Sequence, residues 1–180
     1  MRALFQALLV VALCQAPVAA QEAVPPAVLG PDGLWQEDWF RESTGDLRSD
    51  LALAAAEGRF LAIFWERPGC PYCERLHLEA FRVPELRAYP QERFYAIRLN
   101  RFGRDRVVGF DGVERTHADL ALHHAVWGTP TVEFRIADGT EVFRLPGYAE
   151  PPVLKAAFDY VVLGGYLHMG ILDWLEERGL

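Results

Sequence analysis

The sequence has 180 residues, of which 51% are hydrophobic and 24% charged, and its formal net charge is −7 at pH 7. This length suits a single domain with some additional segments. The negative balance argues against nucleic acid and anionic membrane surfaces as partners, because both repel an acidic protein. We therefore expect one domain that binds no nucleic acid.

The N-terminal residues 1–20 are typical of an export signal. Arg2 supplies a positive start, residues 3–13 form an apolar run, and the small residues Val-Ala-Ala at 18–20 are of the kind that precede a cleavage site. Cleavage there would leave a mature chain of residues 21–180, and the loss of Arg2 would change the net charge from −7 to −8. We expect this mature chain to be exported.

The sequence contains three cysteines, and only Cys70 and Cys73 lie outside the expected signal peptide. An exported protein with one close cysteine pair has no disulfide framework to hold it together, so chemistry explains the pair better than stapling does. The third cysteine, Cys14, offers an alternative, which is a lipid-anchored protein attached at that residue. The bulky Leu13 directly before it fits a lipoprotein cleavage site poorly, and this favours cleavage after Ala20.

Residues 21–43 are expected to be a flexible lead-in to the domain. Residues 21–33 are rich in Ala, Pro and Gly and show no periodicity. Trp35, Trp39 and Phe40 follow. We expect these aromatic side chains to pack on the flank of the domain rather than form a ligand site.

The domain itself is expected over residues 44–180. Helices are indicated by capping residues and apolar spacing, and strands by short apolar runs between turn residues. In the first half of the domain we expect a helix over 46–57, a strand over 60–66, a helix from Pro71 to about 81, a helical piece from Pro84 ended by Pro90, and a strand over 94–99. A charged excursion over 101–115 follows, which is either a small hairpin or a loop beside the active site. The second half is expected to contain a helix capped by Thr116 and ending near Trp127, strands over 131–136 and 141–145, a helix over 150–163, and an amphipathic helix over 166–178 with Leu167, Ile171, Trp174 and Leu175 on one stripe.

The order of these elements predicts the fold class. A helix between two strands requires a parallel pair with a right-handed crossover. The two late strands surround Asp138-Gly139, which is a hairpin signal, so they add antiparallel strands. We therefore expect an α/β fold with a mixed four-stranded sheet flanked by helices, an N-terminal helix and a C-terminal helical extension.

The most informative stretch joins the strand at 60–66 to the next helix. A Pro-Gly pair ends the strand, and Pro71 is a residue well suited to the first helical position because its missing N–H would have no partner there. Cys70 therefore lies at a helix N-terminus, where free N–H groups and the helix dipole favour a thiolate. Cys73 follows within one turn, close enough to attack a mixed disulfide on Cys70. This pattern predicts a redox pair.

Two other uses of the cysteine pair are an inert structural disulfide and half of a metal site. A zinc site needs about four ligands, and no second cysteine pair is present in the sequence. Copper binding would need a nearby histidine. We expect no metal and no cofactor.

A second motif supports the redox interpretation. Gly128-Thr129-Pro130-Thr131 opens a late strand, 57 residues after Cys73. A Cys-x-x-Cys pair at a strand-to-helix junction in a β-α-β unit is the signature of thioredoxins, and Pro130 resembles the thioredoxin proline that is cis and faces the dithiol. The resemblance implies that Pro130 faces the substrate, with Gly128 and Thr129 beside it in the substrate-binding surface.

Further segments narrow the resemblance. Residues 68–73, the excursion over 99–112, the strand start at 129–131 and the Arg-Leu-Pro-Gly-Tyr run at 144–148 together resemble the SoxW-type periplasmic thioredoxins, which accompany bacterial sulfur-oxidation gene clusters. The resemblance covers most of residues 45–175. It implies a thioredoxin-like fold in the periplasm.

The same resemblance implies thiol–disulfide exchange, with Cys70 as the nucleophile and Cys73 as the resolving thiol. Electrons would come from a membrane thiol transporter and pass to disulfides on partner proteins, sulfur-carrier proteins among them. The direction of electron flow is not readable from the sequence, because the Pro-Tyr pair between the cysteines also occurs in glutaredoxins.

The sequence departs from ordinary thioredoxin around the dithiol. Gly69 rather than Trp precedes the first cysteine, and Pro71-Tyr72 replace Gly-Pro. The acid buried on the central strand of thioredoxin is missing, because Ile63 or Phe64 falls there. These departures leave the proton acceptor for the resolving thiol to be found.

Glu66, at the end of the strand, is our candidate acceptor for the proton of Cys73, and a solvated strand-end acid is the alternative. Tyr72 either tunes the pair and shapes a docking surface or is simply exposed. His77, one turn after Cys73, is expected to be an ordinary surface or packing residue, with tuning of the thiols as the alternative.

The function expected from the sequence is a periplasmic thiol–disulfide oxidoreductase that acts as a reductant. Within the same class the alternative is a disulfide oxidase or isomerase. Outside it, the alternatives are a metal-binding module that uses the same two sulfurs and a non-catalytic adaptor that docks partners through the edge at Pro130.

Overall fold

The computed structural model describes residues 25–180. The expected signal peptide over 1–20 and Cys14 lie outside the described residues. The elements in chain order are β1 (Val28–Leu29), β2 (Trp35–Gln36), α1 (Leu47–Ala56), β3 (Phe60–Glu66), α2 (Pro71–Leu78), the short 3-10 helix η1 (Ala80–Arg82), α3 (Pro84–Arg93), β4 (Phe94–Asn100), β5 (Arg106–Val108), β6 (Glu114–Thr116), α4 (His117–His123), β7 (Thr131–Arg135), β8 (Glu141–Pro146), α5 (Pro151–Val162), the 3-10 helix η2 (Gly165–Leu167) and α6 (Ile171–Glu176).

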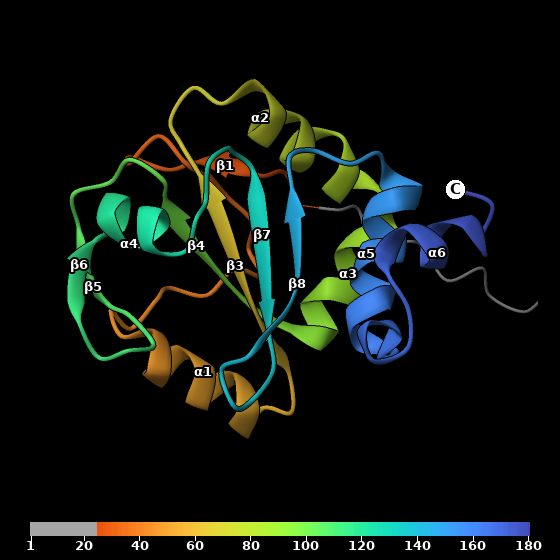
Figure 1. Ribbon diagram of the computed structural model, residues 1–180. Helices are drawn as coiled ribbons and strands as arrows, with labels where there is room; N and C mark the ends of the chain where they lie inside the picture. The colour runs from red at the N-terminus through yellow and green to blue at the C-terminus, as the bar shows by residue number, and fades with distance from the viewer. Residues whose placement is uncertain (1–24) are drawn as a thin grey trace, which may run out of the picture.

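The centre of the fold is a four-stranded sheet with the strand order β4-β3-β7-β8 (Figure 1). β3 and β4 run parallel, because α2, η1 and α3 carry the chain from the end of one to the start of the other. β7 pairs antiparallel with both β3 and β8. The α/β fold with a mixed four-stranded sheet flanked by helices, predicted from the sequence, is confirmed.

Helices cover both faces of this sheet, which explains why the run of the central strand lacks polar residues until Glu66. Ala62 and Phe64 belong to an apolar cluster with residues of α2, η1, α3 and α5. Leu61, Ile63 and Trp65 alternate with them and belong to a second cluster with α1 and α4. Both sides of β3 are therefore buried, as expected of a central strand in an α/β sheet.

The N-terminal segment differs from the expected flexible lead-in. β1 and β2 form a small antiparallel hairpin, and the segment that follows is packed into the domain. Trp39 and Phe40 are buried in the same cluster as Phe64, and the Trp39 ring meets Phe40 and Phe81 edge to face. The reason is physical, since these large aromatic side chains bury much apolar area that water would otherwise cover. The predicted packing of Trp39 and Phe40 on the domain is confirmed, and Leu34 and Glu37 of the same stretch are buried as well.

Two helix ends also differ from expectation. Pro90 lies inside α3 rather than ending it, because its carbonyl still accepts the Phe94 N–H and closes the last turn. α4 ends at His123, before Trp127, because Ala125 adopts a positive φ of 54° that a helix cannot contain.

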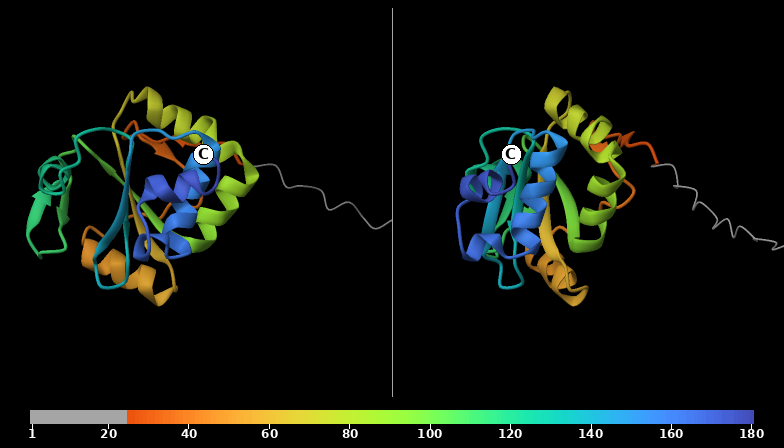
Figure 2. Two further views of the ribbon diagram at one scale, coloured as in Figure 1. Left: turned by 45° about the vertical axis from the view of Figure 1, so that its right-hand side comes forward. Right: turned by 90° about the vertical axis from the view of Figure 1, so that its right-hand side faces the viewer.

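The expected C-terminal helix over 166–178 is instead η2 followed by the short α6. Gly164 turns the chain with a φ of 72°, and Trp174 of α6 is buried against α5. Leu167 is exposed, so it does not belong to an inward stripe. Figure 2 shows α5 and α6 side by side near β8.

Other local predictions are confirmed. The charged excursion contains a small hairpin formed by β5 and β6, and Gly112 occupies its turn with a φ of 78°. The Thr116 side chain caps α4 by accepting a hydrogen bond from the Asp119 N–H. Across residues 25–180, the helices are too short and insufficiently apolar for any of them to span a bilayer.

Candidate active site around Cys70 and Cys73

The two cysteines lie where β3 passes into α2. Gly69 makes the sharp turn between β3 and α2. Its φ is 64°, a conformation that glycine adopts without strain, and the space that a side chain would occupy there is open. Cys70 is the N-cap of α2 in an extended conformation, and Pro71 is the first helical residue. The local sequence therefore places one sulfur at the helix N-terminus, as predicted.

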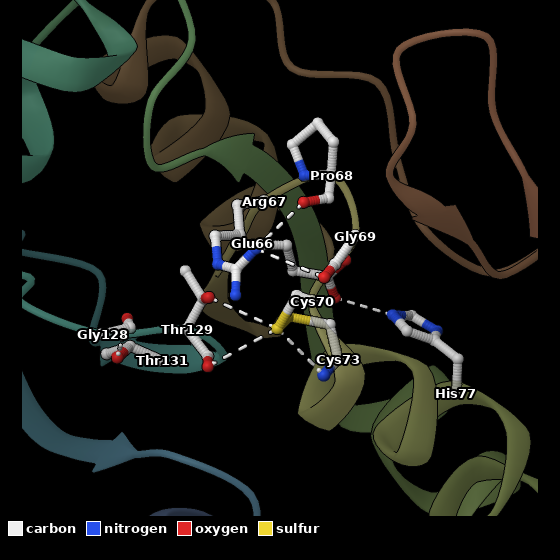
Figure 3. Close-up of a disulfide and its surroundings, with 10 residues drawn as sticks. All are labelled: Glu66, Arg67, Pro68, Gly69, Cys70, Cys73, His77, Gly128, Thr129 and Thr131. Atoms are coloured by element: carbon white, nitrogen blue, oxygen red, sulfur yellow. Dashed lines mark hydrogen bonds and ion pairs between the residues drawn. A yellow bond between two sulfur atoms is a disulfide. The ribbon is translucent and has the colours of Figure 1, made fainter.

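Cys70 and Cys73 form a disulfide (Figure 3). The Cys70 Sγ accepts a hydrogen bond from the Cys73 N–H at 3.1 Å and another from the Thr129 hydroxyl at 3.3 Å. Both donors, together with the positive end of the α2 dipole, favour a negative charge on this sulfur once the disulfide is reduced.

The two cysteines differ in their position relative to solvent. Cys73 is 1% exposed and lies on the buried side of α2, whereas Cys70 is 4% exposed and its chain neighbours Gly69 and Pro71 are exposed. A partner disulfide therefore meets Cys70 before Cys73. The roles of nucleophile for Cys70 and resolving thiol for Cys73, which the resemblance implies, stay predictions.

The loop before β7 lies against Cys70. The Thr129–Pro130 peptide bond is cis, as the resemblance implied, and the Thr129 carbonyl oxygen lies 3.5 Å from the Cys70 Sγ. The Thr131 hydroxyl donates to the Gly128 carbonyl and helps to hold this loop. The structure thus brings Gly128, Thr129 and Pro130 together beside the disulfide.

Glu66 is fully buried, so the alternative of a solvated strand-end acid is wrong. Its Oε1 lies 2.6 Å from the His77 Nε2, and its Oε2 has no hydrogen-bond partner among the described residues. Water does not reach the Glu66 carboxylate, as a solvated acid at the strand end would require. Figure 3 places Glu66 and His77 in the immediate surroundings of the disulfide.

His77 is also fully buried, and its polar contacts exceed those of an ordinary packing residue. Its Nδ1 lies 3.0 Å from Glu37 Oε1, and Trp35 stacks over its ring. Burial alone lowers the pKa of His77, but the charges of Glu66 and Glu37 and the hydrogen bonds to them outweigh that effect and raise the pKa above its ordinary value.

The buried Glu37 and the partly exposed Arg82 complete this group, and neither was identified from the sequence. The Arg82 Nη2 donates to both carboxylate oxygens of Glu37 at 2.5 Å, and the Arg82 Nε donates to the His77 carbonyl oxygen at 2.8 Å. The spacing of four residues between Cys73 and His77 was the available signal for His77. Glu37 had no signal, because it lies in a segment without periodicity.

Tyr72 is exposed and belongs to an aromatic pair beside the dithiol. Its ring stacks on Tyr148 with a centroid distance of 6.4 Å, and the Arg75 guanidinium lies over Tyr148 at 4.3 Å. Trp127, next to Gly128, is 77% exposed. Exposed aromatic side chains are thus found in α2, between the two cysteines, and in the loop before β7, two residues before Thr129.

The described part of the chain holds no group of three or more His, Cys, Asp or Glu side chains that could bind a metal ion.

Residues 47–162, more than half of the chain, match the family model described as "Thioredoxin-like domain". The chain belongs to the thioredoxin-like family. Glu37 lies before the matched residues, so the partner of His77 is supplied by a segment outside them. No match to this thioredoxin-like protein was found among curated proteins.

Solved structures that are similar to this thioredoxin-like protein include the following two. A thioredoxin-fold protein from Helicobacter pylori is 25% identical with a TM-score of 0.57, and the match covers 67% of this chain and 79% of that one. A thioredoxin from Thermus thermophilus is 24% identical with a TM-score of 0.54, and the match covers 70% of this chain and 89% of that one. Both show the same fold.

Proposed function

We propose that this thioredoxin-like protein is a thiol–disulfide oxidoreductase that exchanges its Cys70–Cys73 pair with disulfides of partner proteins. The observation that supports the proposal most is the position of the Cys70 Sγ at a helix N-terminus. It accepts hydrogen bonds from the Cys73 N–H and the Thr129 hydroxyl and lies against the Thr129–Pro130 loop. A purely structural disulfide needs neither arrangement.

The reaction begins with the reduced protein. The Cys70 thiolate attacks one sulfur of a partner disulfide, so a Cys70–partner bond forms while the partner's own S–S bond breaks and its other sulfur leaves with the electron pair. Cys73 then attacks the Cys70 sulfur, gives its proton to Glu66 and releases the second partner thiolate. The protein loses two electrons and the partner gains two.

The partner binds across the exposed surface beside the dithiol. A chain passing Cys70 in an extended conformation lies next to Gly128 and Thr129 on one side and Tyr72 on the other. Pro130 has no N–H to donate, and the loop before it precedes the ladders that pair β7 with β3 and β8. The exposed aromatic rings of Tyr72 and Trp127 supply apolar contact that is tolerant of sequence.

We further propose that the protein acts as a reductant in the periplasm, like the SoxW-type thioredoxins. The export-type residues 1–20, the single cysteine pair of the remaining chain and the resemblance over residues 45–175 support it. Electrons enter from a membrane thiol transporter and leave to oxidised partner proteins, including sulfur carriers. Fractionation of cells and N-terminal sequencing test this location, and an uncleaved cytoplasmic chain would contradict it.

The decisive experiment is trapping with Cys73→Ala. Without the resolving thiol, each substrate remains attached to Cys70 as a mixed disulfide, which mass spectrometry identifies. Cys70→Ala is the matched control and is expected to trap nothing. Equal recovery of proteins with both variants would contradict the proposed exchange, and a Cys73→Ala variant that traps nothing while the wild type binds zinc or copper at one equivalent would favour the metal-binding module.

The reduction potential separates a reductant from an oxidase or isomerase. Equilibration with glutathione or dithiothreitol buffers is expected to give a potential well below the about −120 mV of a strong disulfide oxidant. A value near −120 mV would replace the reductant with an oxidase that works on the same site.

A further inference from the structure

Three buried charged groups and the partly exposed Arg82 form a chain from Glu66, at the end of β3, to the N-terminal segment. The Glu66 Oε1 lies 2.6 Å from the His77 Nε2, the His77 Nδ1 lies 3.0 Å from the Glu37 Oε1, and Glu37 is held by the Arg82 guanidinium at 2.5 Å. Glu66, His77 and Glu37 are each no more than 1% exposed. The remaining groups against the His77 ring are the aromatic rings of Trp35, Phe40 and Phe81.

The geometry defines the protonation of His77. Both ring nitrogens face carboxylate oxygens, and a neutral imidazole carries only one N–H. With His77 neutral, one nitrogen lone pair would point at a carboxylate, whereas an imidazolium donates to both. Two buried carboxylates also need two positive partners, because an unpaired buried charge is strongly destabilising. His77 and Arg82 supply those two charges.

This pairing leaves one oxygen of Glu66 free. Its Oε2 is buried without a partner among the described residues, although buried carboxylate oxygens are nearly always hydrogen-bonded. Cys73 and His77 are four residues apart in the α2 region and are both buried, so they lie on the same side of the helix. The unused oxygen is therefore held in the same buried region as the resolving thiol (Figure 3).

In a second buried glutamate, Glu133, both carboxylate oxygens have polar partners. Glu133 accepts hydrogen bonds from the Trp65 Nε1 at 2.9 Å and the Arg135 Nη2 at 3.0 Å, and the His124 Nδ1 lies 3.0 Å from its Oε2. Both of its oxygens have partners, so it has no acceptor left for a proton donor. Glu66 differs from it in this respect.

We infer that His77 is a positioning residue that holds Glu66 as a carboxylate with Oε2 available for the Cys73 proton, and that Glu37 and Arg82 keep His77 in place. The inference rests on the proposed thiol–disulfide exchange. In the resolving step, the Cys73 S–H bond breaks, its proton goes to Glu66 Oε2, its electron pair forms the Cys70–Cys73 bond, and the partner sulfur leaves as a thiolate. The N-terminal segment thereby completes the site through Glu37.

The test follows each thiol separately with an aromatic disulfide reagent that releases a coloured thiol. Reaction of the reduced protein gives two phases in stopped flow, the first from attack by Cys70 and the second from attack by Cys73 on the mixed disulfide. In His77→Gln, the second phase is expected to slow at pH 7 by on the order of tenfold to a hundredfold, while the first is unchanged. The deficit is expected to shrink as pH rises, because hydroxide replaces the lost base.

Glu66→Gln and Glu37→Gln extend the series. Glu66→Gln removes the proton acceptor and is expected to slow the second phase most. Glu37→Gln retains the His77 and Glu66 side chains, so it is expected to slow the second phase less, with the same pH dependence. His124→Gln is the matched control, because it removes a buried histidine from a glutamate on the other side of the fold and is expected to leave both phases unchanged.

Two results would overturn the inference. One is a second phase of His77→Gln that equals the wild type at pH 7, and the other is a second phase slowed by the same factor at every pH, as a purely structural disturbance would produce. If His77→Gln fails to fold, Glu37→Gln decides by the same criteria. A wild-type protein that reduces no protein disulfide would instead refute the proposed function, so the two failures are distinguishable.

Discussion

The Cys70 sulfur accepts hydrogen bonds from the Cys73 N–H and the Thr129 hydroxyl, and both bonds strengthen when the sulfur is a negatively charged thiolate. The N–H belongs to the backbone of α2, so any residue other than proline at position 73 supplies it. The hydroxyl is specific to the side chain at position 129. The two donors can therefore be separated by mutation.

Thr129→Val removes the hydroxyl and keeps the shape of the side chain. A hydrogen bond to a charged group is worth about 1.5–3 kcal/mol, so its loss is expected to raise the pKa of reduced Cys70 by on the order of one unit. The pH dependence of alkylation by iodoacetamide measures this shift. Thr131→Val is the control, because its hydroxyl donates to the Gly128 carbonyl instead. Equal alkylation profiles for wild type and Thr129→Val would contradict the assigned contact.

Glu66 and His77 show what sequence alone leaves undecided at the scale of residues. The position of Glu66 at a strand end permits both a solvated and a buried acid, and His77 follows a pattern typical of helix surfaces. Their burial depends on Glu37, which is far away in sequence and which balances the charge of His77. Only contact across the fold reveals that the three side chains form one group.

At the scale of elements, the N-terminal segment contributes both to the core and to the site. Trp39 and Phe40 fill the space beside Phe64 and Phe81, and Glu37 reaches His77 from the same stretch. The segment is held by aromatic packing rather than by a long strand, since β1 and β2 contain two residues each. Its packing and the position of Glu37 are therefore coupled.

Phe40→Ala tests the contribution of this segment. Truncation of a buried phenylalanine typically costs about 3–5 kcal/mol, and the free energy of unfolding from urea titration is expected to fall by that amount. Phe102→Ala is the matched control, because Phe102 is 61% exposed and surface changes usually stay within about 0.5 kcal/mol. Similar losses for the two variants would mean that residues 25–43 do not belong to the folded core.

At the scale of the whole molecule, two histidines make stability depend on pH in opposite directions. The pKa of His77 is raised by the charges of Glu66 and Glu37 despite its burial, so the folded protein binds its proton more tightly than the unfolded chain. The pKa of His117 is lowered by burial, so the folded protein binds that proton less tightly. Each shift converts into a slope of stability against pH.

The contribution of His77 is fully present below its unfolded pKa near 6.5 and is lost as pH rises toward its higher folded pKa. We therefore expect the free energy of unfolding of the oxidised protein to decline as pH rises above about 6.5, and His77→Gln to remove that decline. Urea titrations across this range measure it. In His117→Gln the decline is expected to remain, and a decline that persists in His77→Gln would contradict the cationic state of the buried histidine.

The sequence by itself determined the order of the helices and strands around the dithiol, the mixed four-stranded sheet and the place of Cys70 at a helix start. These features follow from local signals, namely apolar runs, glycine and proline turns and caps, which act over a few residues. The tertiary structure alone decided that Pro90 continues a helix, that Leu34 joins Trp39 and Phe40 among the buried residues and that Glu66, His77 and Glu37 share one buried site. Such features depend on which distant side chains meet and on the cost of burying their charges, and neither is encoded in a local pattern.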